Sequence, residues 1–475
     1  MNRMEYKMLI NGILTEGQGA PLTVLNPADR ETIAVVKTAD EAQTRQALEA
    51  ADAALRTWSK TSLNQRQAYV NKLLQALEAR KQEIIRCLIL ETGKDGSTAE
   101  YDYNMLPDCL KFFMEEAKRM GDEIIPDYDG GHMHMVLKKP LGVVACHLAW
   151  NFPILNVAYK LGPILASGCT CVLKPSSDTP LATMLVGQAI AESGLPAGVV
   201  NIVVGSGAVV SKVMNESTIP SMITMIGSTE TGRKLIGQSA TSIKHFSLEL
   251  GGNAPVIVME DADAFEIGKI TAGQKCGNSG QVCVCPNRIF VHESRLEDFL
   301  FGAREYMNSV TLGTGYDAGT NLMGPMINAK AQQRMEDLVK DAVSKGAIVV
   351  CGGKKVDKGF YFEPTILAGV TKDMRVYQEE IFGPILPVLT FNDQDDIVEL
   401  ANDTEFGLAS YVYTHNLEKA MKLAREIDSG NVCVNEPFYN FQLPHGGCKQ
   451  SGVGKDCSHI SLEEYYTLQR VSIRY

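Results

Sequence analysis

Apolar residues follow two different periods along this chain, and each period predicts a different element. Between residues 39 and 93, Leu48, Ala51 and Leu55 recur at the spacing of one helical face, in a segment rich in Ala, Leu, Gln, Glu and Arg. We therefore expect residues 39–93 to be mostly helical. Around 122–139 the sequence Asp-Tyr-Asp-Gly-Gly precedes the run His-Met-His-Met-Val-Leu, which predicts a β-hairpin with a glycine turn.

Farther along, short apolar runs alternate with helical stretches. This alternation predicts a parallel α/β sheet with crossover helices. A second α/β series begins at Asn253 and extends to about Asn431, and the C-terminal residues 467–475 have strand character but are too short to stand alone. The fold class is therefore α/β, and the predicted strands of the first series are 142–147, 169–173, 199–204 and 221–226.

Composition narrows the class of protein. At 475 residues the chain is expected to form two or three domains, and 45% apolar and 21% charged residues are typical of a soluble globular protein. No apolar run reaches the ~20 residues needed to cross a bilayer, and residues 1–7 do not resemble a secretory signal. A net charge of −11 without a basic block argues against nucleic acid, and twelve scattered cysteines favour a reducing, cytoplasmic compartment.

A thiol and a carboxylate form the first candidate site. Cys283 follows a glycine turn in the segment 278–285, and Glu249 lies in an apolar run that ends in Gly251-Gly252. A cysteine nucleophile and a carboxylate base suit covalent chemistry on a carbonyl group. A zinc site built from Cys276, Cys283 and Cys285 is the alternative, but Cys-x-Cys is not the usual ligand spacing and no fourth ligand is near, so we predict no metal.

Four further motifs carry polar groups that suit a cofactor or an oxyanion. The Asn151 amide, in Trp150-Asn151-Phe152-Pro153, is a candidate donor to an oxyanion. Lys174, directly after a predicted strand, is placed to meet ribose or phosphate groups. The segment 227–232, from Gly227-Ser228, opens a predicted helix whose N-terminus favours a pyrophosphate, and Glu379-Glu380-Ile381-Phe382 precedes a turn.

Taken together and in this order, these motifs resemble the aldehyde dehydrogenase superfamily, from Ile10-Asn11-Gly12 to Leu462-Glu463-Glu464-Tyr465. The resemblance implies a Rossmann-like NAD(P)-binding domain (1–121 and 140–250) and an α/β catalytic domain (251–430). It also implies a small β oligomerisation arm and tail (122–139 and 431–475), and hence a homodimer or homotetramer.

The resemblance also assigns roles. Cys283 is expected to attack the aldehyde, Asn151 and the Cys283 backbone N–H to hold the oxyanion, and Glu249 to activate the water that hydrolyses the thioester. Glu249 favours the branch that forms a carboxylic acid over the branch that transfers the acyl group to coenzyme A. The expected cofactor contacts are Lys174 and Ser177 at the adenine ribose, Gly227 and Ser228 at the pyrophosphate, Glu380 at the nicotinamide ribose, with Phe382 and Trp150 beside it.

The residue at position 177 is expected to determine the preference between NAD and NADP. Many NAD-preferring relatives carry glutamate at this position, and that carboxylate would repel a 2′-phosphate. Serine removes the repulsion and Lys174 favours the extra charge, so NADP is expected to be accepted alongside NAD.

The substrate motifs are closest to those of succinate semialdehyde dehydrogenases, yet two arginines that usually hold the substrate carboxylate are replaced by Gly277 and Tyr159. His445 stands where phenylalanine is usual, a variation similar to aminoaldehyde dehydrogenases. An uncharged, aromatic or amino aldehyde therefore suits this chain better than a carboxylate-bearing one. The expected substrate tunnel is lined by Met105, Tyr159, Phe438, Tyr439 and Phe441.

Several alternatives stay open at this point. The enzyme is specific for succinate semialdehyde or an aminoaldehyde in one, and has a thioester-forming or reductive role in another. A catalytically idle member of the same fold is a third, although it has no need for Cys283, Glu249, Asn151 and Lys174 together. A separate question concerns Cys285, which either packs as a bystander or forms a reversible disulfide with Cys283 under oxidation.

Overall fold

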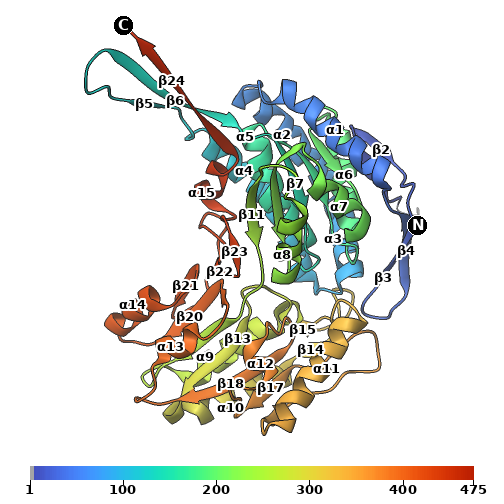
Figure 1. Ribbon diagram of the computed structural model, residues 1–475. Helices are drawn as coiled ribbons and strands as arrows, with labels where there is room; N and C mark the ends of the chain where they lie inside the picture. Colours follow the sequence, from blue (N-terminus) through green and yellow to red (C-terminus); the bar gives the residue numbers. More distant parts are fainter. Residues whose placement is uncertain (1–4) are drawn as a thin grey trace.

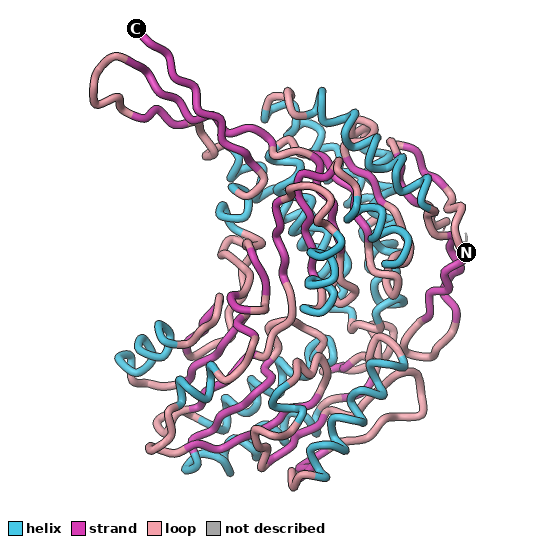
Figure 2. The backbone as a smooth tube through the Cα atoms, in the orientation of Figure 1, coloured by secondary structure: helices cyan, strands magenta, loops and turns pink. Residues whose placement is uncertain are grey.

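Two large β-sheets, one in each half of the chain, organise the molecule (Figure 1). The computed structural model describes residues 5–475, so residues 1–4 of the expected 1–121 segment lie outside the described residues. A third, smaller sheet projects from the body and carries the C-terminus (Figures 1 and 2). The chemistry lies between the two large sheets.

The first sheet has the strand order β2-β1-β9-β8-β7-β10-β11-β23. Its centre is parallel, and β7, β8 and β9 are buried throughout, as expected for apolar strands covered by helices on both faces. The four predicted strands of the first series are confirmed. The strands of this sheet are β1 (Met8–Ile10), β2 (Ile13–Thr15), β7 (Val143–His147), β8 (Thr170–Lys174), β9 (Val200–Ile202), β10 (Pro220–Ile226), β11 (His245–Glu249) and β23 (Gly452–Val453).

Helices pack around this sheet, and their ends follow from local sequence. Ser62 and Gln65 form a reciprocal capping box at the start of the second helix, and Gly93 ends the third in a left-handed conformation. The predicted helical character of residues 39–93 is confirmed. The helices are α1 (Glu41–Trp58), α2 (Leu63–Ala79), α3 (Lys81–Thr92), α4 (Gly96–Ala117), α5 (Pro153–Ser167), α6 (Leu181–Ser193), α7 (Lys212–Glu216) and α8 (Thr229–Gln238), and a hairpin of β3 (Pro21–Leu25) and β4 (Thr32–Lys37) precedes them.

The second sheet has the order β16-β17-β18-β13-β12-β20-β21, with only the edge strand β16 antiparallel. Its strands are β12 (Ala254–Val258), β13 (Pro286–His292), β16 (Ile348–Cys351), β17 (Thr365–Ala368), β18 (Ile385–Phe391), β20 (Ala409–Tyr413) and β21 (Asn431–Val434). The accompanying helices are α9 (Ala264–Cys276), α10 (Leu296–Ser309), α11 (Ala329–Ser344), α12 (Arg375–Gln378), α13 (Ile397–Asn402) and α14 (Leu417–Glu426).

The projecting sheet confirms the predicted hairpin and shows what the C-terminal strand pairs with. Strands β5 (Glu123–Ile125), β6 (His132–Pro140) and β24 (Tyr466–Arg474) are antiparallel, and every residue of β24 faces one of β6. Within 431–475, however, β21 joins the second sheet and β23 joins the first, so only β24 of the tail lies in the arm. The arm exposes apolar side chains, with Ile124 73% and Leu468 65% exposed.

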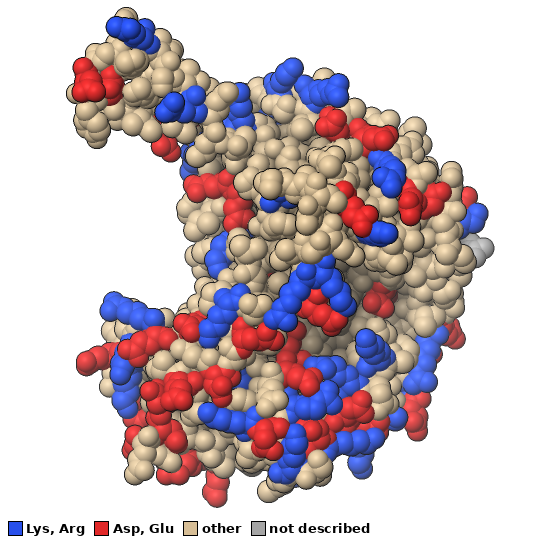
Figure 3. Space-filling view, in the orientation of Figure 1, with Lys and Arg blue, Asp and Glu red and all other residues tan. Residues whose placement is uncertain are grey.

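The surface carries both signs of charge. Acidic and basic side chains are interspersed on the face shown in Figure 3, and a hollow lies between the two halves of the body. Across residues 5–475, no helix combines the length and the apolar character required to cross a membrane.

Candidate active site

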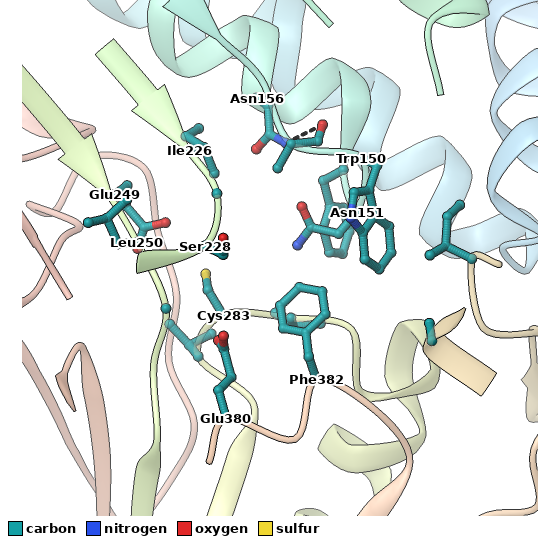
Figure 4. Close-up of a pocket in the computed structure, with 18 of the residues that line it drawn as sticks. Trp150, Asn151, Asn156, Ile226, Ser228, Glu249, Leu250, Cys283, Glu380 and Phe382 are labelled. Atoms are coloured by element: carbon teal, nitrogen blue, oxygen red, sulfur yellow. Dashed lines mark hydrogen bonds between the residues drawn. The ribbon is translucent and has the colours of Figure 1, made fainter. Parts of the chain in front are cut away.

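The carboxyl ends of adjacent parallel strands bring the predicted polar groups together. Lys174 ends β8, Asn151 follows β7, Ser228 follows β10 and Glu249 ends β11. Parallel strands present these ends at one edge of the sheet, which is where ligands bind in open α/β folds. A cavity of about 700 Å³ lies there, between the two halves, and the predicted residues in its wall are Trp150, Asn151, Tyr159, Gly227, Ser228, Glu249, Cys283, Glu380, Phe382 and Tyr439 (Figure 4).

A strained loop presents the thiol. Asn278, Ser279 and Gly280 have φ values of 47°, 57° and 70°, three consecutive left-handed residues between α9 and Cys283. A side chain at Gly280 would collide with the Gly383 carbonyl oxygen at 2.2 Å, so glycine is required. Hydrogen bonds over-determine the loop, since the Ser279 hydroxyl donates to the Gly324 carbonyl at 2.6 Å. The Cys283 sulfur therefore points in a fixed direction, into the cavity (Figure 4).

The Asn151 amide is held beside this loop. Its Nδ2 donates to the Gln281 carbonyl at 3.1 Å, while the Asn278 amide donates to the Asn151 carbonyl at 3.2 Å. An NH₂ group has two protons, so the second N–H of Asn151 stays available to a ligand oxygen. Asp102 of α4 fixes the following helix by accepting the N–H groups of Ile154 and Leu155, at 3.1 and 2.7 Å.

Glu249 and His445 flank the thiol. The Cys283 sulfur lies 3.9 Å from His445 Nε2, and the same nitrogen lies 3.3 Å from Glu249 Oε1. Both flanking residues are buried, at 4% and 6% exposure. Burial raises the pKa of the Cys283 thiol well above its usual range, and the carboxylates of Glu249 and Glu380 raise it further. The thiol therefore needs a proton acceptor before it can react as a thiolate.

Next to the thiol, the cavity has features that fit a nicotinamide dinucleotide. Ser228 caps α8, so the N–H groups of that helix face the cavity wall. Glu380 accepts the Gly252 N–H at 2.9 Å, and burial raises the pKa of its carboxyl to about 7. The rings of Trp150 and Phe382 meet edge to face at 5.4 Å. A carboxylate, helix N–H groups and flat apolar rings suit a ribose, a pyrophosphate and a nicotinamide respectively.

Lys174 and Ser177 extend this edge, outside the wall of the main cavity. The Lys174 ammonium is buried, and burial lowers its pKa to about 8. It donates one hydrogen bond to the Pro175 carbonyl at 3.4 Å, and its other N–H donors are not used by this bond. The Ser177 hydroxyl donates to the Gly205 carbonyl at 3.4 Å. A buried cation with unused donors fits an anionic or hydroxyl-rich ligand.

A second cavity, of about 350 Å³, adjoins the first and shares Tyr101, Phe152, Val282 and Val284 with it. Among the described residues that line it, none is charged. Gly277 lies in this wall, and a side chain there would meet open space within 4 Å.

Three of the expected tunnel residues lie away from both cavity walls. Phe438 is 57% exposed, and the Phe441 ring packs edge to face on Phe112 at 5.5 Å. Met105 is buried in the hydrophobic core of the first half. The aromatic character of a residue alone therefore does not predict whether it lines the cavity. Tyr159 and Tyr439 are the expected residues that do line it.

The two neighbouring cysteines face different cavities. Cys283 lines the first, whereas Cys285 lines the second and its sulfur lies 3.8 Å from the Gln274 carbonyl oxygen. All twelve cysteines are free. A disulfide between Cys283 and Cys285 would therefore require one side chain to turn around.

Sequence reasoning missed several residues of the wall. His445 is a variation in the sequence that the motifs do not place in the site, and Tyr101 and Asn156 lie outside every motif, yet all three line the cavity. The aromatic positions of α4 carry no motif of their own. Only the unusual Pro-His-Gly-Gly segment gave a signal that was available in the sequence.

Comparison with known proteins decides the family. Residues 14–471 match the family described as the aldehyde dehydrogenase family. The chain belongs to the aldehyde dehydrogenase family. It is therefore an oxidoreductase that acts on aldehydes with NAD(P), and the predicted fold class and family are confirmed.

Three relatives illustrate the match. The chain is 36% identical to the succinate-semialdehyde dehydrogenase [NADP(+)] GabD of Escherichia coli K12, over 99% of this chain and 98% of the relative. It is 37% identical to a glutarate-semialdehyde dehydrogenase of Pseudomonas putida KT2440, over 98% and 97%. An NADP-dependent enzyme of E. coli has a solved structure that superposes with a TM-score of 0.97 at 36% identity, covering 100% of this chain and 99% of that one.

Proposed function

We propose that the enzyme oxidises its aldehyde to the carboxylic acid through a covalent intermediate on Cys283. The observation that carries the proposal is the convergence of Cys283, Glu249 and Asn151 on one cavity between the two sheets. The thiol loses its proton to solvent in the cavity, and the thiolate attacks the carbonyl carbon to form a thiohemiacetal. The second N–H of Asn151 and the Cys283 backbone N–H stabilise the resulting oxyanion, a contribution of about 10²–10³ in rate for one donor.

Loss of hydride from the thiohemiacetal gives a thioester on Cys283; bound NAD(P) supplies the hydride acceptor. Glu249 then removes a proton from water, the hydroxide attacks the thioester carbon, and the acid leaves as the thiol is regenerated. The rigid loop 278–280 keeps the sulfur fixed through both halves of the reaction. Burial of Glu249 keeps a single, directed base next to the thioester.

For the cofactor we propose Lys174 and Ser177 at the adenine ribose, Gly227 and Ser228 at the pyrophosphate, and Glu380 at the nicotinamide ribose. Phe382 and Trp150 would then flank the nicotinamide. Ser177 carries no negative charge and Lys174 is a buried cation, which supports acceptance of NADP alongside NAD. The relative from E. coli K12 is described as NADP(+)-dependent, in agreement with this assignment.

Product analysis tests the reaction. We expect one equivalent of reduced cofactor to form rapidly per active site, followed by steady turnover to the free acid that does not require coenzyme A. A requirement for coenzyme A, or the absence of any reduced cofactor with a panel of aldehydes, would contradict the proposed function.

For the substrate, we propose an aldehyde whose distal part carries no carboxylate. The uncharged wall of the second cavity and the tyrosine at 159 supply no cation to a carboxylate, although the named relatives act on semialdehydes. Aliphatic, aromatic and amino aldehydes are therefore expected to have higher kcat/KM than succinate semialdehyde.

The variant Gly277→Arg tests this specificity, because the backbone φ of −56° and the open space beside Gly277 accept a side chain. We expect kcat/KM for succinate semialdehyde to rise, with Gly277→Gln as the uncharged control of similar length. An equal effect of both variants would contradict a charge-based specificity.

We propose that 1–121 with 140–250 forms the cofactor domain, that 251–430 forms the catalytic domain, and that the arm joins two or four copies. The apolar side chains on β5 and β24 support burial against another copy, since exposed strand edges otherwise promote aggregation. Free cysteines throughout support a reducing compartment such as the cytoplasm. Light scattering at several concentrations gives the number of copies.

A further inference from the structure

The side chains of Cys283, His445 and Glu249 form a compact set of three different donor atoms. Sγ, Nε2 and a carboxylate oxygen all lie within 4.8 Å of one another. A thiolate, an imidazole and a carboxylate are the donors that Zn²⁺ prefers, and three protein ligands with one open position are typical of reactive zinc sites. Cys283 and Glu249 are already paired as a candidate site from the sequence, but the addition of His445 is not predictable there because it lies in a distant segment.

The distances match tetrahedral zinc. Zn–N and Zn–O bonds of about 2.0–2.1 Å place two such ligand atoms about 3.3 Å apart, and a Zn–S bond of about 2.3 Å places sulfur and nitrogen about 3.6 Å apart. The corresponding distances are 3.3 Å between Glu249 Oε1 and His445 Nε2, and 3.9 Å between His445 Nε2 and the Cys283 sulfur. The third distance, from the sulfur to the carboxylate oxygen, is at most 4.8 Å, so the sulfur must approach the other two donors to complete the geometry.

The Glu249 carboxylate gives further support for a ligand here. Glu249 is 4% exposed, and apart from His445 Nε2 at 3.3 Å, a member of the same set, its Oε1 has no partner among the described residues. A buried carboxylate oxygen without a donor is costly, and a bound cation would satisfy it. All three side chains line the main cavity, so a fourth, solvent-derived ligand has room.

The backbone around His445 is rigid. Its N–H donates to the Asp456 carbonyl at 2.8 Å, and the Asp456 N–H donates back at 2.7 Å. The Asp456 carboxylate is in turn buried against the Lys160 ammonium at 2.6 and 2.8 Å. The rings of Tyr159 and Tyr439 flank the imidazole at 6.3 and 5.4 Å between centroids. A preorganised ligand of this kind favours tight metal binding.

We propose that Cys283, His445 and Glu249 form a Zn²⁺ site that reversibly inactivates the enzyme. Binding replaces the thiol proton, which leaves to solvent, with a sulfur–zinc bond, and no group is oxidised or reduced. The metal withdraws the sulfur from attack and occupies the carboxylate oxygen that would accept a proton from water. The inhibitory consequence rests on the proposed function, whereas the binding itself depends only on the three donors.

Cobalt(II) spectroscopy tests the site without relying on activity. Full-length enzyme freed of metal with EDTA and desalted is titrated with Co²⁺. We expect one equivalent to give a thiolate-to-cobalt charge-transfer band with the strong visible bands of a tetrahedral ion, and Zn²⁺ to bleach both. A weak octahedral spectrum without charge transfer would overturn the proposal.

Three variants assign the ligands. His445→Phe and Glu249→Gln should each weaken Co²⁺ binding at least ~10-fold, since even the loss of outer-shell partners costs that much. Cys283→Ser should abolish the charge-transfer band. The matched control is Cys285→Ser, a thiol two residues away in the other cavity, which should bind as tightly as the unmodified enzyme. If both His445→Phe and Glu249→Gln bind Co²⁺ normally, the three-ligand site is wrong.

Inhibition is then measured as the Zn²⁺ concentration that halves the rate of each variant relative to its own rate without metal. EDTA is added afterwards to test whether the inhibition is reversible. We expect at least a ~10-fold higher concentration for His445→Phe than for Cys285→Ser. The two proposals separate cleanly. An enzyme that turns over aldehydes but shows no cobalt–thiolate band refutes the metal site alone, and the band in a protein that oxidises no aldehyde refutes the proposed function alone.

Discussion

The exchange Glu249→Gln separates the two halves of the proposed reaction. Glutamine has nearly the same shape as glutamate, and the side chain faces the cavity, so the exchange creates no void in the core. It removes the base and its charge. A positioned general base contributes about 10²–10⁴ in rate, equivalent to about 2.7–5.4 kcal/mol of barrier at 1.36 kcal/mol per tenfold change. Thioester hydrolysis should slow by that factor, while formation of the thioester continues.

The structure adds a second expectation of opposite sign. The Glu249 carboxylate is one of the groups that raise the pKa of the Cys283 thiol, after burial itself. Its removal should lower that pKa, so the thiol should react with iodoacetamide at lower pH in the variant than in the unmodified enzyme. Misfolding would also expose the thiol and lower its pKa, so an intact burst of reduced cofactor is needed to show that the variant is folded.

Stopped-flow absorbance of the reduced cofactor measures the first effect, in buffer containing EDTA. We expect a burst of one equivalent per active site followed by a steady rate reduced by about 10²–10⁴. Glu380→Gln is the matched control for the alkylation profile, measured without cofactor because Glu380 is also the proposed nicotinamide-ribose contact. It removes a carboxylate that raises the thiol pKa but leaves the proposed base in place. A variant of Glu249 that loses the burst itself would show that this residue acts before hydride transfer and refute the reasoning.

Three further outcomes follow from individual contacts. Asn151→Ala should lower the single-turnover rate by about 10²–10³, because one N–H donor to the oxyanion is lost; a decrease below tenfold contradicts the role. Burial lowers the pKa of Lys174 to about 8, so its positive charge is present below that pH and is lost above it. The ratio of kcat/KM for NADP to that for NAD should therefore fall as the pH rises through 8. A ratio that does not change with pH excludes Lys174 as the contact to the 2′-phosphate of NADP. Asp456→Asn leaves the buried Lys160 ammonium without its counter-charge and should reduce the free energy of unfolding by about 3–5 kcal/mol, measured by urea denaturation.

Four central strands of the first sheet and part of the site were accessible from sequence for a simple physical reason. Strands of a covered parallel sheet must be apolar on both faces, so β7, β8 and β10 stand out as apolar runs. The polar residue that ends such a run, as Lys174 and Glu249 do, necessarily lies at the carboxyl edge. Prediction of strands therefore also predicted where the chemistry would gather.

His445 could not be placed in this way. It lies 162 positions from Cys283 in the chain, and the link that brings it close is the pairing of Leu248 and Glu249 with Val453 and Gly452. A strand of two residues, β23, leaves no periodic signal in the sequence. The same limit explains the tunnel, because Phe438 and Tyr439 are adjacent in sequence and only the local path of the tail decides which of them faces the cavity.

Reactivity and metal susceptibility have a common origin in this site. On the proposed roles, the Glu249 carboxylate is the base of the reaction and also one of the three metal ligands. The same carboxylate oxygen lies beside a thiol and an imidazole in a buried wall. Among the described residues, no other donor competes with a divalent cation for this oxygen. A phenylalanine at 445 would remove the nitrogen donor without changing the other two groups. His445 is therefore the residue that makes this aldehyde-oxidising site also able to bind zinc and be inhibited by it.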